Sequence, residues 1–442
     1  MCIRDSAKVA LEESLELLEL LRESPPQARG GLGAEQLRDA YASGLIELAA
    51  VRAASGQVDQ AIEQFRRGIG ELEAGGRDDE SVKVQVAGAC LRLAKVYQSI
   101  DLDQSVHYFE RAVGQLRAVP ALSSRSDRML LADALESYSV AARLSGRSED
   151  SARLVDDALE VLRELKVSYP EDPGILSAYA QALASQATAL GATQPKLADS
   201  RFAEAIALVR QAIVVSPHLT RFRRQLARTS MVAGMHSVEL AELVLARSRL
   251  DEAVRLLEPL VERSGQIKDR VLLAQSLHHG ARARLAGGSE APEGHRRLAA
   301  SHNERAAALL DGVLEEQPDH NHALVVLAGV CVARSEQAKV AGEFGVAATW
   351  FEQAIAGMKR TLEGVEESGS LRAPMMMASM YFELADIRLA GEDRRGAIAA
   401  FSEAVANYRS IPEERRSPGL RKALKGREAE LERLRAEESV SK

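Results

Sequence analysis

The sequence predicts an all-α protein made of stacked helix pairs, and two observations carry this prediction. First, a pattern of a small, a large and a small residue, with three and then two residues between them, recurs eight times. Offsets of four and three place each set on one helical face, and the small residues allow a neighbouring helix to approach closely. Second, only 4% of the residues are aromatic, whereas Ala, Leu, Glu and Arg are abundant, which is typical of helices.

The eight sets follow one another along most of the chain, as expected for an internal repeat. They are Ala61, Phe65 and Gly68; Ser105, Phe109 and Ala112; Ser151, Val155 and Ala158; Ala205, Val209 and Ala212; Ala253, Leu257 and Leu260; Ala306, Leu310 and Val313; Ala347, Phe351 and Ala354; and Ala397, Phe401 and Ala404. In two sets the last position departs from the pattern, because Leu260 and Val313 replace a small residue. Because 442 residues exceed what one compact core usually holds, we expect an array in which each unit contacts only its neighbours.

The N-terminal segment is expected to flank the array. Residues 1–6 resemble strings that sequencing adapters encode, so we expect them to be non-native and the chain to be a fragment. The next segment has an amphipathic helical pattern, whose apolar stripe consists of Leu11, Leu15, Leu18 and Leu21. A proline pair and a glycine-rich stretch then interrupt this pattern, which makes residues 7–33 a flanking helix and linker.

Each unit between residues 34 and 410 is expected to form a helix, a turn and a second helix that carries the pattern. Gly56, Gly146 and Gly342 each lie five residues before the first small residue of a set. Glycine suits the left-handed conformation that ends a helix. Pro217 and Pro318 each follow a set by five residues, where proline ends the second helix.

This arrangement resembles the tetratricopeptide repeat (TPR), whose second helix has the same order of glycine, alanine, aromatic residue and alanine. Gly342, Ala347, Phe351 and Ala354 give the best match, while Tyr97 fits the first helix of the repeat. The resemblance implies a right-handed α-solenoid of about eight TPR-like helix pairs, whose first helices line a concave groove.

The spacing of the units departs from that of the family. The large residues recur every 41 to 54 residues in this chain, whereas the TPR period is about 34 residues. We therefore expect longer helices and insertions, such as residues 191–199 and 287–294.

Residues 411–442 are expected to form a linker and a C-terminal capping helix. A Pro-Gly pair precedes the highly charged segment 420–438, in which Leu424, Leu431 and Leu434 form one apolar line. A polar helix of this kind is what the end of a solenoid requires to remain soluble.

Composition and motifs predict a protein that is not an enzyme and has no cofactor. The chain has none of the common nucleophile, phosphate-loop, kinase or zinc-protease motifs. Its net charge of −7 predicts no nucleic-acid partner, and no apolar run is long enough to span a membrane. The chain has three isolated cysteines, Cys2, Cys90 and Cys331. They lack the spacing of metal ligands, and their odd number does not suit a disulfide framework, which favours a reducing, cytoplasmic location.

Histidine is concentrated in one unit of the array. Six of the nine histidines lie between residues 278 and 322, namely His278, His279, His295, His302, His320 and His322. A metal site needs three or four converging ligands, and these residues lack both cysteine and an i,i+4 pair. We therefore predict no metal site, although a metal or effector sensor remains a third hypothesis.

A stripe of arginines is the candidate partner-binding site. Arg221, Arg224 and Arg228 lie on one face of the first helix of the fifth unit. Since the TPR resemblance places first helices in the concave groove, these side chains would suit an acidic peptide or a terminal carboxylate. An ordinary solvated face, with the arginine stems covering apolar surface, is the alternative.

We therefore expect a non-catalytic scaffold that binds a protein or peptide in its concave groove. The alternative is the C-terminal regulatory or substrate-docking region of a bacterial serine/threonine protein kinase, because TPR arrays resembling this one often follow such catalytic domains.

Overall fold

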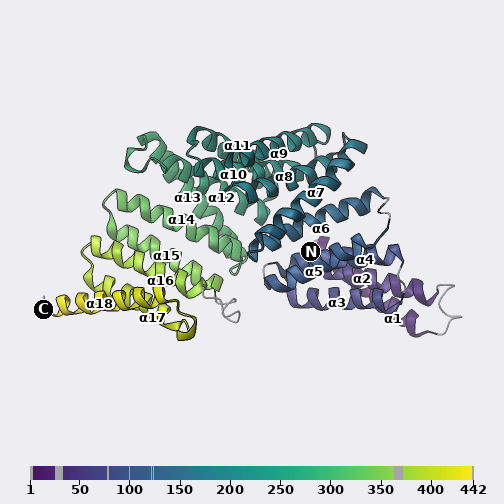
Figure 1. The fold of residues 1–442 in the computed structure, drawn as a ribbon, viewed down its shortest axis with the longest axis horizontal. Helices are drawn as coiled ribbons and strands as arrows, with labels where there is room; N and C mark the ends of the chain where they lie inside the picture. The colour runs from purple at the N-terminus through teal and green to yellow at the C-terminus, as the bar shows by residue number, and fades with distance from the viewer. Residues whose placement is uncertain are drawn as a thin grey trace. The chain divides into compact units, whose positions relative to one another are not determined.

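The computed structural model describes residues 3–24, 33–76, 79–98, 100–120, 122, 124–362 and 372–440, and these residues form eighteen α-helices and no strand (Figure 1). The helices are α1 (Ile3–Glu23), α2 (Ala34–Ala54), α3 (Val58–Ala74), α4 (Glu80–Tyr97), α5 (Leu102–Arg117), α6 (Arg125–Leu144), α7 (Ser148–Ser168), α8 (Pro173–Leu190), α9 (Pro195–Val215), α10 (Thr220–Glu239), α11 (Leu243–Ser264), α12 (Ile267–Leu285), α13 (Glu293–Glu316), α14 (Asn321–Val340), α15 (Phe344–Leu362), α16 (Arg372–Ala390), α17 (Arg394–Ser410) and α18 (Pro418–Val440). The all-α prediction is confirmed.

The chain divides into two compact units, Met1–Phe222 and Arg223–Lys442. Within each unit, consecutive helices pack as antiparallel pairs: α2 with α3, α4 with α5, α6 with α7 and α8 with α9 in the first, and α12 with α13, α14 with α15 and α16 with α17 in the second. Helix α10 packs against α11 through Met231, Ala246 and Leu250. The prediction of about eight helix pairs is therefore confirmed.

The repeated pattern forms the core between the helices. Every residue of the eight sets is buried, including Phe65, Phe109 and Phe401. Burying a side chain of this size stabilises the fold by roughly 1.5–3 kcal/mol, so each large residue of the pattern helps to hold its helix pair together.

The structure shifts the register of the pattern in three units. The sets Ala198–Phe202–Ala205, Ala246–Leu250–Ala253 and Ala299–Asn303–Ala306 lie one heptad before those singled out in the sequence, and all their members are buried. With this register, the large residue lies seven residues after the start of the second helix in seven of the eight pairs. The large residues then recur every 44 to 53 residues, which is more regular than the sequence pattern suggested.

The residues at the turns explain why the sequence did not indicate the correct register of the set that starts at Ala246. Gly56, Gly146 and Gly342 adopt left-handed backbone angles, as expected, with φ of 78°, 81° and 79°. Ala241 and Glu392 hold the same place before their second helices, with φ of 59° and 63°. Neither residue is a glycine. The sequence therefore did not show where the turn between α10 and α11 lies.

Long helices account for most of the large repeat period. Second helices α9, α11 and α13 have 21, 22 and 24 residues. Of the two expected insertions, residues 195–199 already belong to α9, and the other contains a short 3-10 helix, Gly288–Glu290. The boundaries drawn at residues 6, 33 and 410 remain predictions, and residues 25–32 lie outside the described part of the chain.

Arginine side chains join successive helix pairs. Arg111 of α5 reaches Glu73 of α3, Arg117 of α5 reaches Asp157 of α7, and Arg305 of α13 contacts Glu258 of α11 at 2.6 Å. The partners are separated by 38 to 47 residues, which is close to one repeat. These arginines therefore connect one pair of helices to the next.

Candidate functional site

The contacts between first helices define the inner face of each unit. Second helices pack against the first helix of the next pair, as α3 does against α4, and first helices of neighbouring pairs also contact each other, with α2 against α4, α4 against α6, α6 against α8, and α12 against α14. Elements that approach each other lie on the inner side of a bent stack, and helical-repeat proteins use this concave side for binding.

In the first unit, polar side chains of the first helices join each other. Arg92 of α4 contacts Glu47 of α2 at 2.6 Å, and Lys95 of α4 contacts Asp133 of α6 at 2.9 Å. Ser185 of α8 donates a hydrogen bond of 2.5 Å to Glu136 of α6. These charges are engaged within the chain, which leaves them less available to a partner.

The second unit exposes apolar surface on its first helix α14. Val325 and Val340 are 46% and 61% exposed, and both lie on the side of α14 that also carries Glu336. Gly329, on the same side of α14, lies against His278 of α12, and Lys339 contacts Glu383 of α16 at 2.8 Å. We refer to Arg228, Arg282, Val325, Glu336 and Val340 as the inner face of the second unit.

The predicted arginine stripe is not a set of equivalent side chains. Arg224 forms a bidentate ion pair with Asp269 of α12, whose carboxylate is fully buried, and the Nη2–Oδ2 distance is 2.9 Å. Arg221 is exposed and its guanidinium lies over the Phe222 ring. Arg228 is exposed on α10, opposite Ser230, which bonds to Glu252 of α11. The role of the stripe in partner binding remains a prediction, but Arg224 already has a structural partner.

Sequence reasoning missed Arg282. This side chain is exposed on α12, while Arg284, two residues later, points the opposite way and contacts Asp251 of α11 at 2.8 Å. Arg282 therefore points away from α11 and supplies a second exposed guanidinium on a first helix of this unit. The spacing of Arg282 and Arg284 places them on opposite sides of a helix, but it does not tell which of the two is exposed.

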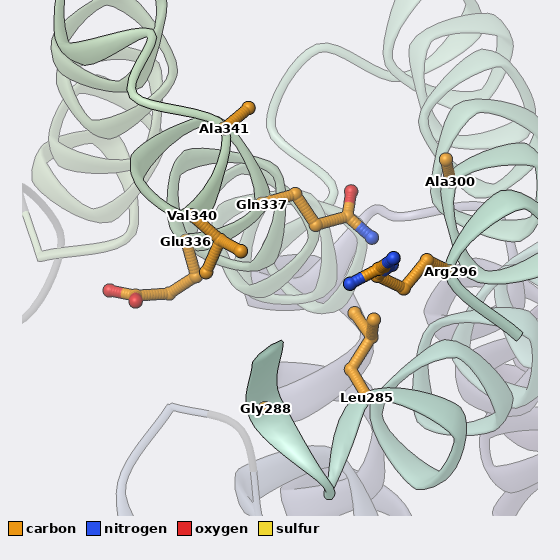
Figure 2. A pocket seen from close by; sticks show the side chains of 8 residues that line it. All are labelled: Leu285, Gly288, Arg296, Ala300, Glu336, Gln337, Val340 and Ala341. Carbon is orange, nitrogen blue, oxygen red and sulfur yellow. The ribbon is translucent and has the colours of Figure 1, made fainter. Parts of the chain in front are cut away.

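A cavity of about 480 Å³ opens beside the inner face of the second unit (Figure 2). Leu285 at the end of α12, Ala300 of α13, and Val340 with Ala341 at the end of α14 supply its apolar lining. Arg296 of α13 and Gln337 of α14 extend their polar groups into the same space from opposite sides (Figure 2). A volume of this size is ordinary for a site that binds a small ligand or part of a peptide.

The histidine-rich unit forms a buried polar contact between helices. His278 of α12 is almost fully buried, and its Nδ1 lies 3.4 Å from Oδ1 of Asn303 on α13. Asn303 occupies the position where most second helices carry a large apolar residue. Burial lowers the pKa of His278 to about 4 and that of His279 to about 3, so both imidazoles are neutral at pH 7.

The remaining histidines do not converge with these two into a metal site. His320 caps α14 by accepting a hydrogen bond of 3.1 Å from the backbone N–H of Ala323. Across the part of the chain that the structure describes, no three His, Cys, Asp or Glu side chains are placed to hold a metal ion.

The two described cysteines are buried thiols. Burial raises the pKa of Cys90 to about 12 and that of Cys331 to about 11, which suppresses the reactive thiolate.

In a Cys2→Ser background, we expect neither thiol to react with a disulfide-exchange reagent at pH 8 until urea unfolds the protein. Absorbance of the released thiol measures this, and rapid reaction of the folded protein would contradict the assignment.

None of the described helices combines the length and apolar character needed to cross a bilayer.

Comparisons with known proteins show what the fold is similar to. No protein-family model and no curated protein matches the sequence. A signal-transduction ATPase with a tetratricopeptide repeat sensor, from Pyrococcus horikoshii, is 12% identical with a TM-score of 0.50; the match covers 91% of this chain and about half, 52%, of that chain. Apo NprR, a quorum sensor from B. thuringiensis, is 14% identical over 80% of this chain and 84% of that one, with a TM-score of 0.49. Apo RapI is 12% identical over 73% of this chain and 99% of that one, also at 0.49.

Identities this low speak to the fold alone. The match to the Pyrococcus horikoshii structure and the buried repeat pattern together show that this chain has a TPR-like helical-repeat fold.

Proposed function

We propose that the chain is a non-catalytic binding protein whose inner face in the second unit holds an acidic peptide or protein segment. The observation that carries this proposal is the combination of exposed Val325 and Val340 with exposed Arg228 and Arg282 on first helices of one unit. Apolar contacts supply affinity, and the two guanidinium groups select for negative charge and accelerate association. The kinase-tail hypothesis has no support from the structure or the comparisons and stays a prediction from resemblance.

The test uses a fluorescein-labelled peptide of repeated Glu-Leu-Asp units and the full chain. We expect the double variant Arg228→Glu and Arg282→Glu to weaken binding at least tenfold and to reduce its dependence on salt, because two attractive charges become repulsive. Fluorescence anisotropy measures both effects. Arg224 is left intact, since its loss would disturb the fold instead of the surface.

The matched control is the double variant Arg297→Glu and Arg305→Glu on α13, which also reverses two exposed arginines of the second unit. Equal weakening by both double variants would show that only the net charge matters and would overturn the assignment of the inner face.

A further inference from the structure

A cavity of about 230 Å³ lies in the first unit, where the C-terminal ends of α6 and α8 meet the first half of α7. Ala152 and Val155 of α7 and Leu190 of α8 give it an apolar wall. Arg143 of α6 and Asp156 of α7 also line it. Side chains of opposite charge therefore border one apolar space.

The two charges lie towards opposite ends of the cavity. Only residues 145–147 separate α6 from α7, which keeps Arg143 close to Ser148 at the start of α7. Asp156 lies eight residues after Ser148, where its Oδ1 accepts a 2.8 Å hydrogen bond from Nε2 of Gln186 on α8. Eight residues of an α-helix span about 12 Å, so a positive and a negative end are separated by roughly this distance.

Both charged groups remain available to a ligand. Arg143 is exposed, and its guanidinium has no ion pair, hydrogen bond or ring contact within the described part of the chain. Asp156 is also exposed, and among the described residues it forms no ion pair. Its one hydrogen bond comes from a neutral amide and uses a single oxygen, which leaves the negative charge of the carboxylate uncompensated.

The lining suits a ligand with a charged group at each end. The guanidinium of Arg143 and the exposed hydroxyl of Ser148 can donate to a carboxylate, and Asp156 can accept from an ammonium group. The apolar wall between them suits methylene groups. A chain of five methylene groups with a hydrogen bond of about 2.8 Å at each end spans roughly 13 Å, which matches the length of the cavity.

We propose that this cavity binds a linear zwitterion, with its carboxylate at Arg143, its ammonium group at Asp156 and an aliphatic chain of about five carbons along Ala152, Val155 and Leu190. Both a free amino acid of this shape and the C-terminal lysine of a peptide carry these groups. The site lies in the first unit, so the inference goes beyond the proposed function and does not depend on the inner face of the second unit.

The experiment uses 6-aminohexanoate as the probe, with hexanoate and hexylamine as analogues that each lack one end group. Saturation-transfer NMR with the full chain measures the dissociation constant of each molecule. We expect 6-aminohexanoate to bind at least fivefold more tightly than either analogue, because only this molecule engages both charged ends. The shorter 4-aminobutanoate should bind as weakly as the analogues, since its chain cannot span the cavity.

Two variants test the two ends separately. Arg143→Met should abolish the preference for 6-aminohexanoate over hexylamine, and Asp156→Asn should abolish its preference over hexanoate. Both side chains are exposed, and the introduced amide can still accept the bond from Gln186, so we expect both variants to fold. Arg153→Met and Glu160→Gln are the matched controls on α7, because both residues are exposed and lie outside the cavity lining.

Three results would overturn the inference: no saturable binding of 6-aminohexanoate, equal affinity for the three six-carbon molecules, or equal effects of the variants and their controls. Acetyl-Gly-Lys presents the same two groups at the end of a peptide. Tighter binding of this peptide than of 6-aminohexanoate, lost in the same two variants, would identify a C-terminal lysine as the source, whereas weaker binding would identify a free small molecule. Binding of the Glu-Leu-Asp peptide by the second unit is tested independently of all these results.

Discussion

Replacing Arg224 with methionine is expected to lower the free energy of unfolding of the second unit by about 3–5 kcal/mol. The variant leaves the carboxylate of Asp269, which has no exposed surface, without its bidentate partner. A charge left unpaired in the interior cannot recover its lost hydration. Thermal unfolding of the full chain measures the effect, and the midpoint of the second unit should fall by roughly 6–20 °C.

Arg305→Met provides the control for this prediction. Arg305 also joins neighbouring helix pairs, but it and Glu258 are 50% and 33% exposed, so its loss should cost about 1 kcal/mol or less. Adding Asp269→Asn to Arg224→Met removes the unpaired charge and should restore much of the stability. If the Arg224 variant is no less stable than the Arg305 variant, the buried pair does not hold α10 to α12 as described.

Acidification is expected to destabilise helices α12 to α14 before those of the first unit. The pKa of His278 is about 4 in the folded chain, below the value of 6.5 for a free imidazole. As the pH falls from 6.5 to 4, His278 binds a proton in the unfolded chain but not in the folded chain. The free energy of unfolding that is present above pH 6.5 therefore decreases through this range. The loss attributable to His278 is about 3 kcal/mol at pH 4, and His279 extends it towards pH 3.

Hydrogen exchange of α12 to α14 between pH 7 and pH 4, corrected for the intrinsic exchange rate, measures this loss locally. His278→Gln should reduce the pH dependence without abolishing it, because the Gln amide does not titrate and can still bond to Asn303, whereas His279 is unchanged. His107→Gln, which changes an exposed histidine of α5, should leave the profile unchanged. A profile in the His278 variant that matches the parent would show that other groups control the acid response.

The core of the fold could be read from the sequence because it depends on local periodicity. Small and large residues at offsets of four and three must lie on one helical face in any helix, and every such set proved to be buried. The register was harder to read in three units, because the pattern continues for a second heptad in the longer second helices. Ala253, for example, belongs both to the set that starts at Ala246 and to the one that it begins itself, and only the position of the turn distinguishes them.

The candidate site was harder to predict than the core. An arginine stripe identifies a helical face but not the partner of each side chain. Arg224 and Asp269 are 45 residues apart, and their contact follows from the packing of α10 against α12. Arg296 and Gln337 likewise come from different helices, so no spacing in the sequence predicts the cavity that both residues line.

The sequence by itself determined that this protein is all-α, that its helices pair, and which faces those pairs bury, because these properties follow from residues within one or two turns of each other. Only the tertiary structure decided which charges are engaged inside the chain, where the inner face lies and where a cavity remains. Those features depend on contacts between helices about one repeat apart, and long side chains such as arginine can satisfy either a neighbouring helix or a partner with the same local sequence.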